Sequence, residues 1–575
     1  MVEGKKKSIK AAAILNAIII VAIIVVVNVL SSIQYFRFDL TSDKVHTLSE
    51  SSQSIIDSIP SVVNIEIYLE DENLSPELLK LQRAIDEKFQ DFKEYSKGKI
   101  KYKFINPNDE DINSEEFQKH LFETGLQNIV VNIKEENSFK AVNIWPCAKV
   151  YYADKAANIQ FIDQGKSFSD AGINTAINEL EYAITKAIFE VINTTRKRIA
   201  FVEGHGELTE AQTWIINNQL SQLYYTERKK IDGKLNALFG FDMAIVAKPQ
   251  EAFSDKDAYI LDQFIMKGGK VMWLIDPVDV KADSLKKTGQ TMALAQTFNV
   301  ENQLFKYGAR LNNDLVIDKR CGPIMIPGYG SKLWNWYFHP LASLHKKNDQ
   351  DTIHSITKNV NPVKLQYVST VDAVGNEEVK KTVILETSEY SMHYKAPARV
   401  NYGIILVNPN FSTANNRPHQ PLALLLEGKF HSYFTNYVSP TYLNNPDVKH
   451  KDESPENKMI VIGDGDLIRN EIVLDQQGRE LYIGLDYEPE MRNMQYVQKI
   501  YGNTTFFLNA VDYLLGQDKL VQLRAREMVF RPLDEDKIKG GKKSFWQFVN
   551  IILPILLLLV LATILWLTRR AKYKK

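Results

Sequence analysis

The sequence is poor in cysteine: Cys147 and Cys321 are the two cysteines among 575 residues. The spacing C-x-x-C does not occur, so dithiol redox chemistry is not supported. In an oxidising compartment the two side chains could form one disulfide. The sequence leaves open whether they pair or remain two buried thiols.

The chain also lacks an excess of charge of either sign, since 70 basic and 70 acidic side chains give a formal net charge of +0. The first ten residues carry a net charge of +3 and the last seven carry +5, so the remainder carries −8. A mildly acidic middle gives no electrostatic case for binding nucleic acid. Low-complexity segments and convincing repeats are missing as well.

Common catalytic signatures are absent. Gly165-Lys166-Ser167 resembles the end of a phosphate-binding loop, but the first glycine of that motif would fall at Gln160. Neither H-E-x-x-H nor G-x-S-x-G occurs. No segment assembles a nucleophile with a base and an orienting group. We therefore expect no ATP binding, no cofactor and no enzymatic activity in this chain.

Two long apolar runs are present near opposite ends of the sequence, Ala11–Leu30 and Phe545–Thr568. Each is long enough to cross about 30 Å of hydrocarbon as a helix. The first run exceeds the apolar region of a cleavable signal peptide, and no small-x-small site follows it cleanly, which favours an uncleaved anchor. The residues between the two runs must then lie wholly on one side of a membrane.

The charges beside the first run predict which side that is. Four lysines between Lys5 and Lys10 precede the run, and the next cations, Arg37 and Lys44, are fewer and farther away. Positive charge is retained in the cytoplasm, so we expect the amino terminus inside and the middle outside. Basic residues flank the second run on both sides, but two spans return the chain to its starting side. We therefore expect both termini in the cytoplasm and the residues between the two spans outside it.

The segment after the first run has the pattern of a small α/β unit. A strand is expected at 62–69 and another at 99–105. Between them, Ser75 and Pro76 mark the start of a helix, because serine caps helices and proline suits their first turn. This strand–helix–strand order, with further strands near 129–133 and 141–152, predicts a thioredoxin-like layer.

A long helix expected at 172–192 leads into a second α/β unit. Here strands alternate with helices at a spacing that predicts a parallel sheet. The expected strands are 198–202, 243–247 and 270–275, and a further buried strand is expected at 458–462.

Polar residues follow several of these strands, and ligands of parallel sheets bind outside the carboxyl ends of the strands. His205 and Glu207 follow the first strand and Asp276 follows the third, so the three mark one candidate ligand edge. The loop around His205 also suits a tight strand-to-helix connection with the histidine bonded locally. Asp464 and Asp466 resemble a cation-binding pair, although D-G-D after a strand is also ordinary turn chemistry. Whether a metal binds at either place stays open.

Several segments agree in order and spacing with one known family. They are RFDLTSDKVHTLSE at 37–50, RIAFVEGHGE at 198–207, GGKVMWLIDP at 268–277 and YGARLNNDLVID at 307–318. Together with the two-anchor layout, they make the chain resemble the GldG family over nearly its whole length. GldG proteins are gliding-motility-associated ABC transporter components of Bacteroidetes-type bacteria, within a wider group of ABC-transport auxiliary proteins.

The resemblance implies a non-enzymatic subunit that works with a membrane permease and a cytoplasmic ATPase. It also implies support of gliding motility and the associated secretion, with periplasmic motility or secretion proteins as further partners. The second α/β unit is similar to the class I glutamine-amidotransferase fold. Amidotransferase activity needs a nucleophilic cysteine at a sharp turn after a strand, and neither Cys147 nor Cys321 lies in such a setting.

Two alternative functions stay open. One is a periplasmic scaffold of envelope machinery that binds no ligand. The other is a membrane-anchored periplasmic carbohydrate-binding protein or hydrolase that uses His205, Glu207 and Asp276.

The expected fold class is therefore α/β: a bitopic, two-anchor membrane protein whose ectodomain contains a thioredoxin-like unit and a glutamine-amidotransferase-like parallel-sheet unit. The expected organisation is a cytoplasmic tail (1–10), a transmembrane helix (11–33), a juxtamembrane segment (34–60), the thioredoxin-like unit (61–165), the amidotransferase-like unit (166–302), a mixed α/β region (303–531), a connector (532–544), a second transmembrane helix (545–568) and a cytoplasmic tail (569–575).

Overall fold

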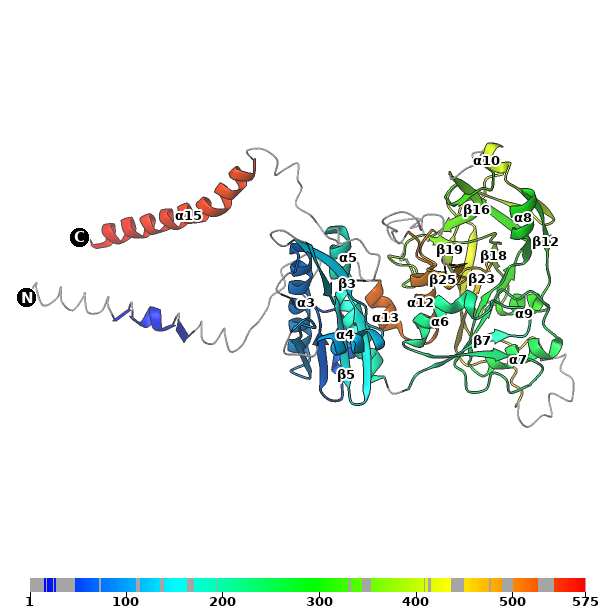
Figure 1. Cartoon of the computed structure of the whole chain (residues 1–575), viewed down its shortest axis with the longest axis horizontal. Coiled ribbons are helices and arrows are strands. Elements are labelled where there is room, and N and C mark those ends of the chain that lie inside the picture. Colours follow the sequence, from blue (N-terminus) through cyan, green and yellow to red (C-terminus); the bar gives the residue numbers. More distant parts are fainter. Residues whose placement is uncertain are drawn as a thin grey trace, which may run out of the picture. The chain divides into compact units, whose positions relative to one another are not determined.

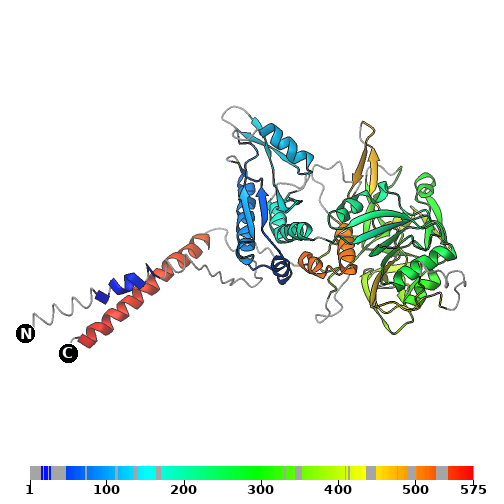
Figure 2. The same ribbon diagram turned by 90° about the horizontal axis from the view of Figure 1, so that it is seen from below.

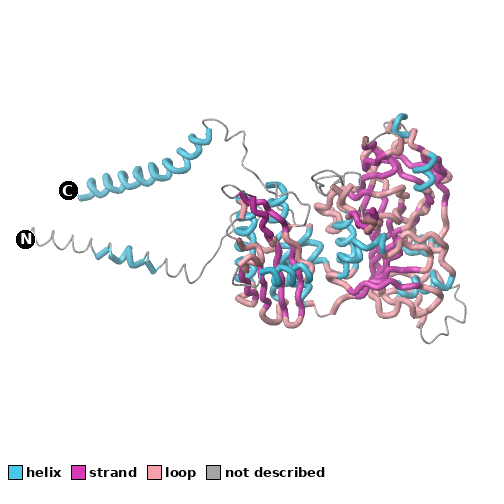
Figure 3. Tube along the Cα trace, in the orientation of Figure 1, coloured by secondary structure: helices cyan, strands magenta, loops and turns pink. Residues whose placement is uncertain are grey.

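The computed structural model divides into two compact units, Met1–Glu527 and Met528–Lys575, which are described separately. The described residues are 47–71, 74–109, 114–134, 139–162, 170–193, 195–328, 332–343, 353–407, 409–411, 415–435, 449–474, 477–488, 500–525 and 542–573, with short pieces between 15 and 26. Figure 3 marks their helices and strands. Most of the predicted first anchor (11–33) lies outside the described residues. The predicted juxtamembrane segment (34–60) is described only from residue 47 onward.

The described part of the second unit is a single helix, α15 (Lys542–Tyr573). Its stretch Phe545–Ala571 is long and apolar enough to cross a membrane, and none of it is buried. Pro554 lies inside the helix, a position that membrane-spanning helices tolerate when neighbouring groups satisfy the freed backbone. The predicted second apolar helix is thus present and suggests a membrane anchor, whereas its orientation stays a prediction.

The first unit begins with a four-stranded sheet in the order β2-β1-β5-β6. The strands are β1 (Val63–Ile67), β2 (Ile100–Phe104), β5 (Cys147–Tyr152) and β6 (Lys155–Gln160). Helix α3 (Pro76–Tyr95) joins the parallel strands β1 and β2, whereas β5 and β6 each run antiparallel to the strand before them in the sheet. As predicted, the Ser75 hydroxyl caps α3 by accepting the backbone N–H of Leu78.

Helices α3 and α5 (Asp170–Ile192) contact each other and the strands of this sheet, so both lie on one of its faces (Figure 1). Helix α4 (Ser114–Glu123) and the hairpin β3 (Ile129–Lys134) and β4 (Phe139–Ile144) are inserted between β2 and β5. The predicted strand–helix–strand unit is confirmed, and its assignment to the thioredoxin class stays a prediction.

A seven-stranded sheet in the order β19-β22-β23-β10-β9-β7-β8 forms the centre of the remaining structure. The strands are β7 (Arg198–Glu203), β8 (Tyr225–Lys230), β9 (Met243–Ala247), β10 (Lys270–Leu274), β19 (Val379–Glu386), β22 (Pro421–Gly428) and β23 (Asn457–Ile462). The five from β23 to β8 run parallel, which confirms the predicted parallel sheet, and β22 and β19 add an antiparallel edge. Strands from both sides of the predicted boundary at 302 therefore share one sheet.

Successive residues of the central strands pack into two different cores, because side chains alternate between the faces of a sheet. Met243 and Ile245 of β9 belong to the core that includes α12 (Asn503–Leu514), whereas Ala244 and Val246 belong to the core that includes α7 (Asp255–Met266). Both faces are covered, so β9 is apolar throughout its length.

Smaller elements surround the large sheet. They are η1 (Ala211–Thr213), α6 (Trp214–Ser221), β11 (Val278–Val280), α8 (Ala282–Thr288), β12 (Gln290–Ala295), α9 (Glu301–Tyr307), β13 (Ala309–Leu311), β14 (Asp314–Asp318), β15 (Cys321–Met325), β16 (Leu333–Ala342), β17 (Val363–Lys364), β18 (Val371–Ala373), β20 (Ser391–Lys395), β21 (Ala398–Asn401), α10 (Ile404–Val407), β24 (Glu471–Leu474) and β25 (Glu480–Ile483). Figure 2 shows the amber hairpin of β24 and β25 standing out from its surroundings.

The two cysteines belong to different sheets, Cys147 to β5 and Cys321 to β15, and both are free thiols. Burial raises the pKa of Cys321 to about 12, which keeps its thiol protonated. The alternative of two unpaired thiols is therefore the one that the structure contains.

Two short helices of this unit, far apart in the sequence, lie against each other. Helix α2 (Glu50–Asp57) and helix α13 (Asp518–Arg524) contact one another, and both contact α5. The Ser51 hydroxyl donates a hydrogen bond of 3.3 Å to the Gln522 side chain. Helix α2 follows the first apolar run in the sequence and α13 precedes the second, and both pack against α5.

Candidate functional site

A cavity of about 460 Å³ opens at the carboxyl ends of the central parallel strands. Three of its lining residues lie just beyond neighbouring strands: Lys248 directly follows β9, Asp276 comes shortly after β10, and Asp466 comes shortly after β23. Because these strands are adjacent and parallel, their polar ends meet at one edge, where α/β sheets bind ligands.

The ammonium of Lys248 joins two carboxylates at this edge. Its Nζ lies 3.0 Å from Asp276 Oδ2 and forms a second ion pair with Asp466. Arg469 Nη1 lies 3.3 Å from the other oxygen of Asp466. Lys248 thus supplies the positive charge that a bound cation would otherwise give to Asp276 and Asp466.

Asp464 serves a different purpose from Asp466. It is fully buried, and its two oxygens accept the backbone N–H groups of Gln366 at 2.6 Å and of Asp466 at 2.7 Å. Burial, together with the charges of Asp276 and Asp466, raises the pKa of Asp464 well above its usual range. Among the described residues, no group of three or more His, Cys, Asp or Glu side chains is placed to hold a metal ion. A cation at Asp464 and Asp466 stays a prediction.

Two glycines let the loop after β23 approach its neighbours. A Cβ atom on Gly463 would lie 2.1 Å from the carbonyl oxygen of Ser369, and one on Gly465 would lie 2.7 Å from the Cβ of Lys248. The N–H of Gly465 donates to Asp276. The D-G-D sequence is therefore explained by close backbone packing around Lys248.

We expect the substitution Asp276→Asn to remove a pH-dependent part of the stability. Burial raises the pKa of Asp276 to about 6, although Lys248 acts against the shift. A carboxyl group with a raised folded-state pKa costs stability while ionised, and this cost disappears as the pH falls through that pKa. The wild type should therefore gain roughly 1 kcal/mol of unfolding free energy between about pH 7 and pH 5. Denaturant titrations should show a flatter pH profile for Asp276→Asn, and identical profiles would contradict this expectation.

His205 and Glu207 form a second cluster at the same edge. His205 Nδ1 lies 3.2 Å from Glu207 Oε1, and Nε2 lies 3.3 Å from Oδ2 of Asp257 at the start of α7. The imidazole also packs on Phe253, with ring centroids 3.9 Å apart. Burial lowers the pKa of His205, but the hydrogen bonds and charges of Glu207 and Asp257 outweigh it and raise the pKa above its usual value. The histidine thus ties the loop after β7 to α7.

The predicted ligand edge therefore contains two groups with different partners. His205 contacts both Glu207 and Asp257, whereas Asp276 joins Asp466 through Lys248. The hydrogen bonds of His205 within this region agree with the alternative that its loop is a tight strand-to-helix connection. A role of these residues in ligand binding stays a prediction.

An imidazole from outside the seven-stranded sheet also lines this cavity. His339 of β16 is 8% exposed, and neither ring nitrogen has a hydrogen-bond partner among the described residues. Burial lowers its pKa well below the usual value, so the ring is neutral and offers one donor and one acceptor. Nearby, Lys364 Nζ lies 2.8 Å from Glu488, which also accepts the hydroxyl of Tyr501 at 2.6 Å.

Sequence reasoning missed several residues of this site. Lys248 had a usable signal, because it directly follows the buried strand 243–247, as Asp276 and Asp464 follow theirs. His339, Lys364 and Glu488 had none, since each comes from a segment whose pattern shows no link to the sheet edge.

Comparisons with known proteins place the chain in a family. The model of a family described as "ABC-type uncharacterized transport system" matches residues 196–510, which is more than half of the chain. The chain belongs to this family of ABC-transport auxiliary proteins. A second model, for a domain of unknown function, matches residues 42–151.

Individual relatives add little about activity. An uncharacterized protein of Borreliella burgdorferi is 22% identical over 439 residues, which cover 74% of this chain and 79% of that protein. Among solved structures, the mmIFT52 N-terminal domain is 13% identical and matches 56% of this chain and 97% of that chain, with a TM-score of 0.32. A likeness at that TM-score carries no argument about function.

Proposed function

We propose that this chain is the membrane-anchored, non-enzymatic extracytoplasmic subunit of an ABC transporter complex. The observation that carries the proposal is the family match over 196–510 in a chain that also contains the apolar helix Phe545–Ala571. The subunit would lie in the inner membrane, with both termini in the cytoplasm and the domain between them in the periplasm. It would work with a permease and a cytoplasmic ATPase, since its own sequence contains no complete phosphate-binding loop.

The finer part of the proposal is a GldG-type role in gliding motility and the associated secretion. It rests on the resemblance of the segments at 37–50, 198–207, 268–277 and 307–318. Periplasmic motility or secretion proteins would then be partners of the domain outside the membrane.

The contact among α2, α5 and α13 supports a mechanical link between membrane and domain. Glu181 of α5 is buried and accepts the backbone N–H of Ser49 at 2.7 Å and the hydroxyl of Ser52 at 2.8 Å. Movement of the chain near α2 or near α13 would therefore act directly on α5. The segments 37–50 and 523–543 are the proposed couplers between the permease and the domain.

Purification of the tagged full-length protein in a gentle detergent tests the proposal. We expect a permease and a nucleotide-binding subunit to co-purify, with vanadate-sensitive ATP hydrolysis. Glycine substitutions in the connector (532–544) should preserve this assembly and ATP hydrolysis but abolish motility, because they interrupt the mechanical link. Recovery of the protein alone, or with envelope proteins only, would argue against the transporter and for the scaffold.

A second candidate function is that of a membrane-anchored periplasmic binding protein for a polar ligand such as a carbohydrate. His339, which shares the cavity with Lys248 and Asp276 and has no hydrogen-bond partner among the described residues, favours it, because buried polar groups normally have such a partner. This function requires ligand binding by the purified chain without a permease.

A further inference from the structure

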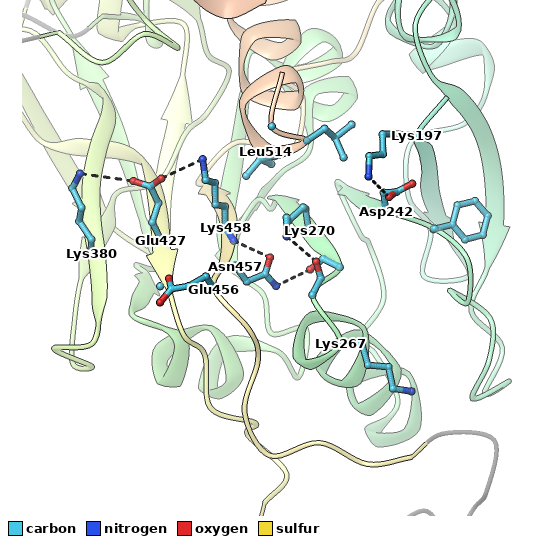
Figure 4. Close-up of a pocket in the computed structure, with 16 residues that line it drawn as sticks. Lys197, Asp242, Lys267, Lys270, Lys380, Glu427, Glu456, Asn457, Lys458 and Leu514 are labelled. Atoms are coloured by element: carbon cyan, nitrogen blue, oxygen red, sulfur yellow. Dashed lines mark hydrogen bonds and ion pairs between the residues drawn. The ribbon is translucent and has the colours of Figure 1, made fainter. Parts of the chain in front are cut away.

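A larger cavity, of about 700 Å³, lies at the opposite edge of the seven-stranded sheet (Figure 4). It opens where the parallel strands begin: Lys197 precedes β7, Asp242 precedes β9, Lys270 begins β10, and Lys458 lies at the start of β23. Its size is that of a pocket for a small molecule. None of these residues takes part in the site at the carboxyl ends of the strands.

Positive charge exceeds negative charge in this cavity, because five lysines and three carboxylates line it. At one side, Lys197 pairs with Asp242 at 3.0 Å. At the other side, Lys380 and Lys458 share the carboxylate of Glu427, at 3.9 and 3.6 Å. Figure 4 shows these two groups with Lys270 between them.

Lys270 has no carboxylate partner among the described residues. Its Nζ donates one hydrogen bond of 2.8 Å, to the carbonyl oxygen of Gly268, although an ammonium has three donors. Burial lowers the pKa of Lys270, and the charges of Lys458 and Lys197 lower it further, although the charge of Asp242 acts against the shift. The lysines of the cavity therefore repel one another, and a negatively charged ligand would reduce this electrostatic repulsion.

The ends of helices α7 and α12 do not account for this excess of charge. A helix carboxyl end carries roughly half a negative elementary charge, which falls off within the last turn. Such an end explains the contact of Lys270 with Gly268, just beyond α7. It does not balance the excess of five lysines over three carboxylates.

Apart from these charges and the Asn457 side chain, the lining of the cavity is apolar or glycine backbone. Leu514, at the end of α12, and Phe241 contribute hydrocarbon, and Gly268 and Gly516 leave the backbone uncovered. A ligand with charged groups on an organic body suits such a cavity better than a simple ion does.

We propose that this cavity binds a small organic oligoanion, with at least two phosphate or carboxylate groups, between Lys197, Lys270 and Lys458. Lysine ammonium groups bind such anions as point charges through charge-assisted hydrogen bonds. This site is separate from the proposed transporter role and does not depend on it.

Calorimetry on the full-length protein in mild detergent at low ionic strength tests the site, with pyrophosphate and citrate as probes. We expect at least one probe to bind, and the stronger one identifies the charged group that the cavity prefers. Lys270→Met should weaken binding about tenfold or more, the expected effect of losing one charge-assisted bond. Lys270→Arg should retain most of the binding, and added salt should weaken it.

The control is Lys287→Met on α8, an exposed lysine outside the cavity, which should bind like the wild type. Thermal unfolding without a probe checks the fold of each variant. If Lys270→Met does not fold, Lys458→Met removes another charge of the same group. Absence of binding by both probes, or unchanged binding in a folded Lys270→Met or Lys458→Met protein, would overturn the proposal. Neither result bears on co-purification with a permease.

Discussion

Replacing Lys248 by methionine is expected to destabilise the first unit by about 3–5 kcal/mol, the usual cost of breaking a buried ion pair. Methionine keeps most of the side-chain volume, so the loss would come from charge rather than from a cavity. Asp276 and Asp466 would remain buried without the ammonium that now joins them. The loss should shrink as the pH falls toward about 5, because the carboxyl groups can then take up protons.

Urea unfolding at several pH values measures this effect. Lys286→Met is the matched control, because Lys286 lines the same cavity but is exposed and has no ion pair among the described residues. The double variant Lys248→Met/Asp276→Asn should lose less than the sum of the single variants, since each removes the other's partner. A Lys248→Met protein as stable as the wild type, or a loss independent of pH, would refute the expectation.

Replacing Arg524 by alanine is the second change with a large expected effect, again about 3–5 kcal/mol. Arg524 of α13 lies 2.9 Å from Asp512 of α12, whose side chain is 2% exposed and also accepts the Tyr224 hydroxyl at 2.6 Å. Arg524 donates to the Tyr182 hydroxyl of α5 as well. The guanidinium thus holds α5 and α12 together, and its removal would leave a buried carboxylate and loosen the contact.

Chemical unfolding gives the loss of stability, and hydrogen exchange of the α5 and α13 backbone shows where it occurs. Arg524→Lys serves as the control, because it keeps the charge but loses the forked contacts, and should fall between the wild type and alanine. If α5 is the link to the membrane, Arg524→Ala should also impair transporter function in a complex that still assembles. Unchanged exchange in α5 would show that Arg524 does not support this contact.

Elements defined by local patterns were predictable. The strand expected at 243–247 coincides with β9, and the helix expected after Ser75 begins at Pro76. Apolar runs, caps and prolines act within a few residues of one another, so their effect can be read along the chain. The same patterns predicted His205, Glu207 and Asp276 at one edge of the sheet, and Asp464 and Asp466 as a separate pair after another strand.

The partners of those residues were not predictable. Lys248 and Asp466 lie 218 positions apart in the sequence and meet because β9, β10 and β23 are neighbours in one sheet. The order of strands in a sheet depends on which apolar faces pack together. Two α/β segments with similar sequence patterns do not reveal that order. His339 enters the cavity from β16, outside this sheet altogether.

The sequence by itself determined that the chain has an apolar helix near residue 560, alternating strands and helices, and no complete phosphate-binding loop, because each is a property of a short continuous segment. The tertiary structure alone decided which charges meet. His205 faces Asp257 while Asp276 faces Lys248, and Lys270 is left between two paired groups of charge. These pairings depend on which strands are neighbours in the folded sheet. A buried charge is tolerated only where the folded structure brings an opposite charge close to it.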